Sequence, residues 1–288
     1  MKTYLFVNPL AGRYAGRRIN RVVSRLNEAG LAPVVFTVKT PADALPYCRI
    51  INESVARPLV VVAAGDGTVN AVVNGLLPGK ATLAVLPMGT SNVLAAELGI
   101  GSVDDGLHRI VAGKTRQLSV GVLELENASY RFVLMAGIGI DGTVVRDVWP
   151  LGKRFLKQGA FALSALRCCL KWDQSMLEVV LPERTVVCHS VIVCNASCYG
   201  GNFIIAPESS LFSPELTAVC ISNNRRKTYA RLALQLFSGG AGASRELVRF
   251  TASGIEIKGT KPIQIDGDFV GYGPARLTSV VDFARIIV

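Results

Sequence analysis

The sequence predicts a chain of two parts, an α/β part with a parallel sheet followed by a mostly β part. In roughly the first hundred residues, short apolar runs alternate with segments of helical periodicity, a pattern typical of parallel strands covered by helices. From about Lys114 the pattern changes to many short β-rich runs. The chain has 288 residues, enough for two domains, since domains cluster near ~100 to 150 residues.

The elements of the first part follow from its apolar spacing. Short apolar runs predict strands at Tyr4–Val7, Pro33–Val38, Leu59–Ala63 and Thr82–Leu86. Helical periodicity between them predicts helices at Gly16–Ala29, Pro41–Glu53 and Thr68–Leu76. In a parallel sheet the carboxyl ends of the strands share one edge, so we expect the turns after these strands to lie together.

The second part is expected to consist of short strands interrupted by two helices. The β-rich runs are Leu118–Glu126, Tyr130–Ala136, Met176–Leu181, Val186–Asn195, Leu216–Ile221, Leu247–Phe250, Ile255–Ile257 and Pro262–Ile265. Helical segments are predicted around Gly159–Trp172 and Lys227–Ser238. No Pro-rich linker marks the boundary, which we expect near residue 116.

Composition excludes several classes of protein. Hydrophobic residues make up 50% of the chain and charged residues 18%, which excludes intrinsic disorder. The longest apolar runs are far shorter than the ~18 to 20 residues that a membrane-spanning helix needs, and the first residues lack the pattern of a secretory signal, so we expect a cytoplasmic protein. Seven cysteines without regular spacing fit reduced thiols rather than a disulfide framework.

The charge indicates an anionic partner. The net charge is +10, which favours nucleic acid, nucleotides or anionic lipid. Basic and apolar residues are interleaved in two segments, at 153–157 and at 225–237, as is typical of segments that bind a membrane surface. The alternative for each segment is a solvated helix face.

The chemistry begins at the strand ends. Leu59–Ala64 runs into Gly65, Asp66, Gly67 and Thr68, and a helix follows. The glycines allow close backbone approach, the helix N-terminus offers N–H groups to phosphate, and Asp66 could reach a metal ion or a nucleotide hydroxyl. Taken alone, Gly-Asp-Gly is as consistent with an ordinary turn.

Two further turns strengthen the prediction. Tyr4–Val7 is followed by Asn8–Arg13, and Thr82–Leu86 is followed by Pro87–Asn92. Three Gly-containing turns with amide, hydroxyl and guanidinium groups on one edge suit a polyphosphate. No segment matches the GxxxxGK[ST] loop of other nucleotide-binding proteins.

Five ordered motifs carry a family resemblance. They are Asn8–Gly12, Gly65–Thr68, Pro87–Asn92, Gly137–Asp141 and Gln264–Asp268. Together they resemble the bacterial diacylglycerol kinase-like lipid kinases, which are related to sphingosine and ceramide kinases and more remotely to NAD kinases. The resemblance implies an α/β ATP-binding domain at 1–116 with the tail at about 278–288, and an antiparallel β-sandwich lipid domain at 117–277, with ATP bound between them.

The resemblance also assigns residues. The nucleotide site would comprise Asn8, Gly12, Arg13, Gly65, Asp66, Gly67, Thr68, Gly89, Thr90 and Asn92. Asp66 would hold Mg²⁺ together with ATP. Asp266 would be the general base, with Asp141 and Asp268 on the substrate side. The alternative for Asp266 is the common Asp-Gly hairpin turn, and for Asp141 it is a structural turn.

The chain also departs from the family pattern. Val93 stands where many members have an aspartate, which puts the choice of lipid in doubt. Ser213 and Thr217 replace the carboxylates that help to hold a structural Mg²⁺, so we expect that ion to be absent. The segment Gly137–Gly142 fits GxGxxG, but a dinucleotide-binding fold needs a helix next and an acid about 20 residues later, and positions 159–165 hold no acid.

These expectations converge on one activity. The chain is expected to be an ATP- and Mg²⁺-dependent kinase of a lipid hydroxyl at an anionic membrane surface, with peripheral membrane association and without a nucleic-acid partner. The identity of the lipid and a homodimer stay open. The alternatives are a kinase of a soluble substrate such as NAD, and a nonenzymatic sensor of nucleotide or lipid.

Overall fold

The computed structural model describes residues 2–10, 15–147, 173–201, 203–237 and 244–288. The chain forms two compact units. Unit 1 comprises residues 1–120, 200–202 and 280–288, and unit 2 comprises residues 121–199 and 203–279. The sequence pattern placed the boundary near residue 116, and the family resemblance added the tail at about 278–288 to the first domain; these domain limits stay a prediction.

Unit 1 contains a parallel sheet. Its strands lie in the order β2-β1-β3-β4-β18, and every neighbouring pair is parallel. The strands are β1 (Thr3–Val7), β2 (Val34–Thr37), β3 (Leu59–Ala64), β4 (Thr82–Pro87) and the last part of β18 (Ala275–Ile287). The helices are α1 (Ala15–Glu28), α2 (Ala44–Asn52), α3 (Asp66–Gly75), α4 (Val93–Glu97) and α5 (Val103–Ala112), with a 3-10 turn at Pro41–Asp43 before α2.

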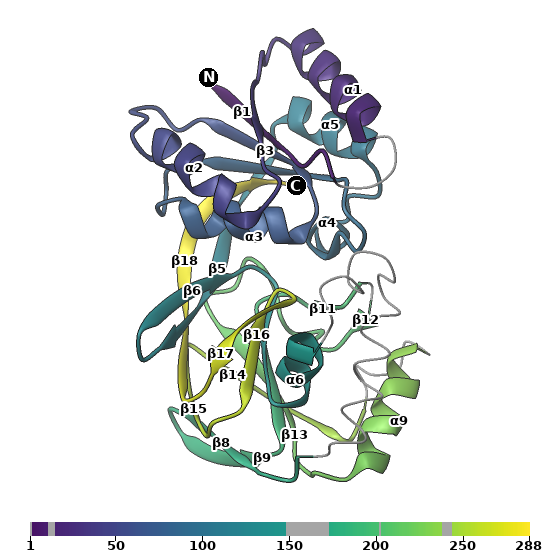
Figure 1. Ribbon diagram of the computed structural model, residues 1–288, viewed down its shortest axis with the longest axis vertical. Helices are drawn as coiled ribbons and strands as arrows, with labels where there is room; N and C mark the ends of the chain where they lie inside the picture. Colours follow the sequence, from purple (N-terminus) through teal and green to yellow (C-terminus); the bar gives the residue numbers. More distant parts are fainter. Residues whose placement is uncertain (1, 11–14, 148–172, 202, 238–243) are drawn as a thin grey trace. The chain divides into compact units, whose positions relative to one another are not determined.

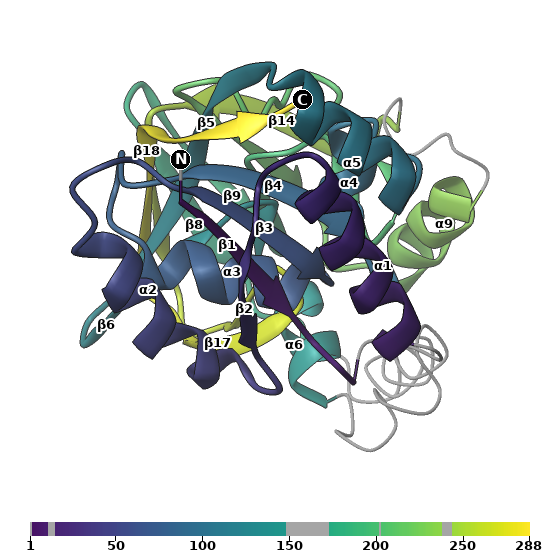
Figure 2. The same cartoon turned by 90° about the horizontal axis from the view of Figure 1, so that it is seen from above.

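Helices cover both faces of this sheet (Figure 2). Alternate side chains of β1 point to opposite faces, as in any strand. Leu5 and Val7 join the buried cluster that includes residues of α1 and α5. Phe6 instead packs in an aromatic group with Phe36 and Tyr47, on the side of α2. Because both faces are buried, residues 4–7 of β1 and all of β3 form unbroken apolar runs.

Unit 2 is built from antiparallel strands (Figure 1). One sheet has the order β14-β13-β10-β7-β16-β17. In a second set, the first part of β18 pairs with β15, β15 pairs with β8, and β8 pairs with β9. Their bounds are β7 (Met135–Ile138), β8 (Leu177–Leu181), β9 (Arg184–Cys188), β10 (Ser190–Cys194), β13 (Leu216–Ile221), β14 (Leu247–Ala252), β15 (Gly254–Lys258), β16 (Pro262–Ile265) and β17 (Asp268–Tyr272). The remaining elements are the paired strands β5 (Thr115–Leu125) and β6 (Ala128–Phe132), the short strands β11 (Cys198–Tyr199) and β12 (Phe203–Ile204), and the helices α6 (Ile140–Asp147) and α9 (Arg226–Phe237).

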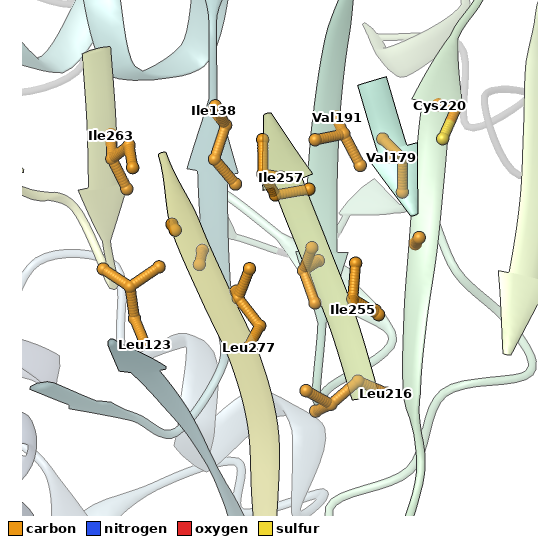
Figure 3. Packing of buried hydrophobic residues seen from close by; sticks show 14 of the residues in the cluster. Leu123, Ile138, Val179, Val191, Leu216, Cys220, Ile255, Ile257, Ile263 and Leu277 are labelled. Carbon is orange, nitrogen blue, oxygen red and sulfur yellow. The ribbon is translucent and has the colours of Figure 1, made fainter. Parts of the chain in front are cut away.

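The core of unit 2 lies between these strands. Ile138, Val191 and Ile263 come from the first sheet, while Val179 and Leu277 come from the second set, and all belong to one buried cluster. Figure 3 shows the side chains directed towards one another between the two layers. The N-terminal α/β unit and the antiparallel β-sandwich expected from the sequence are confirmed.

Some element predictions were wrong in detail. The run Val186–Asn195 is two strands, because the chain leaves β9 in one layer at Cys188 and enters β10 in the other at Ser190. The run Tyr130–Ala136 is also two strands, β6 and β7. Apolar spacing does not reveal a change of layer. The short helices α4, α5 and α6 and the strands β17 and β18 were not predicted, and the helix expected at Gly159–Trp172 lies outside the described residues.

Candidate functional site: two clusters at strand ends

Three turns of unit 1 lie at one edge of its sheet, as predicted. Strands β1, β3 and β4 are parallel and adjacent, so the turns that follow them leave from the same edge. Asn8 directly follows β1, and its side-chain oxygen accepts a hydrogen bond from the Leu10 N–H at 2.8 Å. Gly12 and Arg13 lie outside the described residues.

The turns after β3 and β4 touch through glycine backbone. A methyl group at Gly89 would lie 2.4 Å from the Gly65 Cα, and one at Gly65 would lie 3.2 Å from the Gly89 Cα. Contacts of the shorter kind are not seen for real side chains, so Gly89 must lack one for the two turns to close. The two motifs that the sequence placed on one edge are therefore in direct contact.

Asn92 shapes the turn that follows β4. It adopts the left-handed conformation, with φ 47°. Its side-chain oxygen accepts from the Gly89 N–H at 2.7 Å, and its amide donates to the Gly89 carbonyl at 3.1 Å. Thr90 is exposed beside it, whereas Thr68 is buried in the first turn of α3. Asn92 thus holds the turn in shape, and the exposed Thr90 offers a hydroxyl to a ligand.

Asp66 caps a helix. It is the first residue of α3, and its carboxylate oxygens accept hydrogen bonds from the Val93 N–H at 3.0 Å and the Leu94 N–H at 3.1 Å. These are the first residues of α4, whose N–H groups have no partner within their own helix. The sequence did not reveal this contact, because it joins two turns that are 27 residues apart.

Arg18 is a neighbour of the site that the motifs missed. It lies on α1, and its guanidinium donates to the Pro87 carbonyl at 3.1 Å, where β4 ends and the turn that follows it begins. No local pattern distinguishes it from the other arginines of α1. The part of unit 1 that the structure describes therefore places one part-buried cation next to the turn.

Unit 2 holds a second cluster, centred on Asp141. The Tyr199 hydroxyl donates to Asp141 Oδ1 at 2.5 Å, and the Gln264 amide donates to Asp141 Oδ2 at 2.6 Å. Burial raises the pKa of Asp141, and these two hydrogen bonds only partly offset that rise. A methyl group at Gly137 would lie 1.8 Å from Asp141 Oδ2, so the glycine is what makes room for the carboxylate.

Asp266 occupies a tight hairpin turn between β16 and β17. Asp266 and Gly267 both have positive φ, 46° and 90°, as a two-residue type I′ turn requires. The Asp266 carboxylate accepts three backbone hydrogen bonds, from Val133 at 2.8 Å, Leu134 at 2.9 Å and Met135 at 3.0 Å. Asp268 follows the turn and is exposed. The local geometry is thus the Asp-Gly hairpin turn that the sequence analysis gave as the alternative for Asp266.

Gln264 links the Asp141 carboxylate to the backbone of the turn that carries Asp266. Its amide nitrogen binds Asp141, and its oxygen accepts from the Gly267 N–H at 2.8 Å. Asp141 is therefore joined through Gln264 to the turn at Asp266 and Gly267, whereas the Asp266 carboxylate itself is bonded to the N–H groups of residues 133–135. Gln264 lies inside a motif but was given no role, and Tyr199 lies outside every motif. We refer to Asp141, Tyr199, Gln264 and the turn at Asp266 and Gly267 as the acid cluster.

The GxGxxG segment leads into a helix. This helix, α6, begins at Ile140 inside the segment, as a dinucleotide-binding fold would need. The preceding strand β7 pairs antiparallel with both β10 and β16, however, so the parallel arrangement of a dinucleotide-binding fold is absent at this strand.

No metal cage is present in the described parts of the chain. There, no group of three or more His, Cys, Asp or Glu side chains could hold an ion. Ser213 accepts a hydrogen bond from the Glu215 N–H at 3.1 Å, and Thr217 is buried in β13. The absence of a structural Mg²⁺ there stays a prediction.

Comparison with known proteins decides the family. The family described as "Diacylglycerol kinase catalytic domain" matches residues 2–123, and the "YegS C-terminal NAD kinase beta sandwich-like domain" matches residues 135–288. The chain belongs to the bacterial diacylglycerol kinase-like lipid kinases. It is a lipid kinase by family, which implies ATP as the phosphate donor.

Named relatives agree over almost the full length. A diacylglycerol kinase of Bacillus subtilis (strain 168) is 24% identical over 297 residues, covering 99% of this chain and 95% of the relative. A diacylglycerol kinase of Mycobacterium tuberculosis (strain ATCC 25618 / H37Rv) is 25% identical, covering 97% of this chain and 92% of the relative.

Solved structures share the fold. The crystal structure of a diacylglycerol kinase from Bacillus anthracis str. Sterne aligns with a TM-score of 0.73 at 19% identity, covering 99% of this chain and 96% of that chain. Another chain from the same organism gives a TM-score of 0.83 at 22% identity, covering 99% and 94%. Among the described helices of this lipid kinase, none has the length and apolar character needed to span a bilayer.

Proposed function

We propose that this lipid kinase transfers the γ-phosphoryl group of ATP to the hydroxyl of a diacylglycerol-like lipid at a membrane surface. The observation that carries the proposal is the backbone contact of Gly65 with Gly89, at the edge where β3 and β4 end. That contact brings together two turns whose N–H groups and hydroxyls suit phosphate oxygens. The acid cluster of unit 2 supplies the carboxylates for the acceptor hydroxyl.

The donor set of unit 1 fits a Mg²⁺ ion that arrives with ATP. Mg²⁺ is usually held by one or two carboxylates together with substrate phosphates and water, rather than by a cage of protein ligands. Asp66 supplies one carboxylate, whose position is fixed by the Val93 and Leu94 N–H groups. When bound, the ion would neutralise phosphate charge. We assign Asp66 to it, with Asn8, Thr90 and Arg18 as neighbours of the nucleotide.

The roles in unit 2 follow from hydrogen bonding. A general base must be held where the acceptor hydroxyl arrives. Asp266 is held by three backbone N–H groups, so its carboxylate is fixed before substrate binds. We assign Asp266 as the proton acceptor. Asp141, whose pKa is raised by burial, is joined through Gln264 to the backbone of the same turn and would contact the lipid headgroup.

The membrane part of the proposal rests on charge. The net charge of +10 favours anionic lipid, at about 1 kcal/mol for each Lys or Arg near the surface. On α9, Arg226, Lys227 and Leu234 are exposed, whereas Leu232 is buried and Tyr229 turns inward. The apolar contribution of this helix is therefore smaller than its sequence suggests. The other basic segment, at 153–157, lies outside the described residues.

One experiment separates the candidate activities. The purified chain is incubated with labelled ATP, Mg²⁺ and either a mixed lipid extract or NAD. We expect label in the lipid fraction and none in NAD. Label in NAD alone would identify a kinase of a soluble substrate, and ATP binding without transfer to either acceptor would identify a sensor. Either outcome would overturn the proposal.

A further inference from the structure

The helix that carries Asp141 begins against a serine of a neighbouring strand. The Ile140 N–H, in the first turn of α6, donates to Ser190 Oγ at 3.1 Å. A methyl group at Gly139 would lie 2.6 Å from the same oxygen, so the serine sits directly on the turn into the helix. Ser190 is buried at the start of β10. Its hydroxyl therefore satisfies an N–H group that has no partner within α6.

The next contact of Ser190 leads to another helix. The hydroxyl of Tyr229, on α9, is hydrogen-bonded to Ser190 Oγ at 3.0 Å. The same hydroxyl lies 2.7 Å from His189 Nδ1. His189 Nε2 donates to the Asp173 carbonyl at 2.7 Å, since a carbonyl can only accept. A continuous polar chain thus runs from α9 to the first turn of α6.

The first turn of α6 is in close contact with its neighbours, so it cannot shift without breaking contacts with them. A methyl group at Gly142 would lie 2.1 Å from the Pro262 carbonyl oxygen, so α6 and β16 are in backbone contact. The Gly139 N–H donates to the same carbonyl at 2.9 Å. Asp141 in turn makes bonds of 2.5 and 2.6 Å with Tyr199 and Gln264. A shift of the first turn would stretch all of these contacts together.

We propose that Tyr229 and Ser190 are positioning residues for Asp141: the bond between their hydroxyls fixes the first turn of α6 and thereby the carboxylate that faces the lipid. The proposal rests on the proposed function for its effect on lipid turnover. Neither residue touches substrate in it, since both act through the Ile140 N–H. Arg226 and Lys227 of α9 are exposed, so the helix proposed to meet the membrane is also the one that holds the first turn of α6.

The test deletes single hydroxyls. Tyr229→Phe and Ser190→Ala keep most of the side-chain volume. The control Ala233→Gly lowers the helix propensity of an exposed position of α9 by about 1 kcal/mol without removing a member of the polar chain. Two measurements are made on each full-length variant. Hydrogen exchange reports the Ile140 amide, and steady-state kinetics report kcat/KM for lipid together with KM for ATP.

We expect faster exchange at Ile140 and a roughly 10- to 100-fold loss of kcat/KM for lipid in both hydroxyl deletions, because small misplacements of a reacting group have effects of this size. KM for ATP should stay within about twofold of the parent. Ala233→Gly should leave both measurements near the parent values.

Unchanged exchange at Ile140 would overturn the proposal whatever the activity does. Faster exchange with unchanged lipid kinetics would also overturn it, because the contact would then be structural only. If the parent protein transferred no phosphate to lipid, the proposed function would fail, while the exchange measurement would still decide whether the polar chain holds α6.

Discussion

At the scale of single residues, Asp266 combines a structural contact with a proposed chemical role. Asp266→Asn replaces one carboxylate oxygen by an N–H₂ group; with the remaining oxygen accepting from Leu134 and Met135, the N–H₂ group would face the Val133 N–H. We expect a loss of about 1 to 3 kcal/mol in the free energy of unfolding, because a buried donor loses its acceptor. Lipid turnover should fall by ~10²- to 10⁴-fold, as for the loss of a general base.

Chemical denaturation and kinetics well below the melting temperature separate the two effects. Glu256→Gln removes an exposed carboxylate on β15 and should change neither stability nor turnover. If a folded Asp266→Asn protein phosphorylated lipid at the parental rate, Asp266 would be a turn residue only, and Asp141 would become the next candidate for the base.

His189 should make the stability of the protein depend on pH. Burial lowers the pKa of His189 below its usual 6.5, so the folded state binds a proton less readily than the unfolded state. The unfolded state then holds more protons below pH 6.5, and stability falls as the pH drops through that value. Unfolding curves between pH 5 and 8 should show this fall in the parent, and His189→Gln should lose it. A variant with the parental pH dependence would contradict the assignment.

At the scale of elements, the contact between the turns after β3 and β4 can be tested by adding one methyl group at Gly89. Gly89→Ala would place its Cβ 2.4 Å from the backbone of Gly65, so the turns must separate. We expect a lower melting temperature and at least about tenfold weaker ATP binding, measured by calorimetry. Gly16→Ala is the matched control, since nothing lies within 4 Å of the added methyl group and Gly-to-Ala changes in a helix are favourable by about 0.5 to 1 kcal/mol. Unchanged ATP binding in Gly89→Ala would show that the contact does not shape the site.

Sequence reasoning succeeded where local pattern determines structure. Apolar runs and turn residues predicted strand ends at Val7, Ala63 and Leu86, and the observed strands end at Val7, Ala64 and Pro87; parallel pairing brings the turns together. It could not show that Asp66 caps α4, because the motif specifies a carboxylate but not which N–H groups reach it. Tyr199 meets Asp141 across 58 residues through the fold of unit 2, and no local pattern predicts such a contact.

At the scale of the whole molecule, the excess of basic residues should govern membrane binding. With a net charge of +10, we expect the protein to sediment with anionic vesicles at low salt and to be released as salt rises, because exposed charges are screened within ~8 Å at physiological ionic strength. Activity on lipid in those vesicles should follow binding. Neutral vesicles of otherwise equal composition are the control, and equal binding to both at low salt would contradict the prediction.

The segmented make-up of unit 1 affects how the protein is made. Residues 285 and 286 of β18 pair with β4, and Ile286 is buried, yet these residues follow the whole of unit 2 in the chain. On the ribosome, the first unit to emerge therefore waits for its last strand until the second unit has been synthesised. During that interval β4 is an unpaired edge with exposed apolar groups, the kind of surface that chaperones bind. The α/β unit begins synthesis first and is completed last.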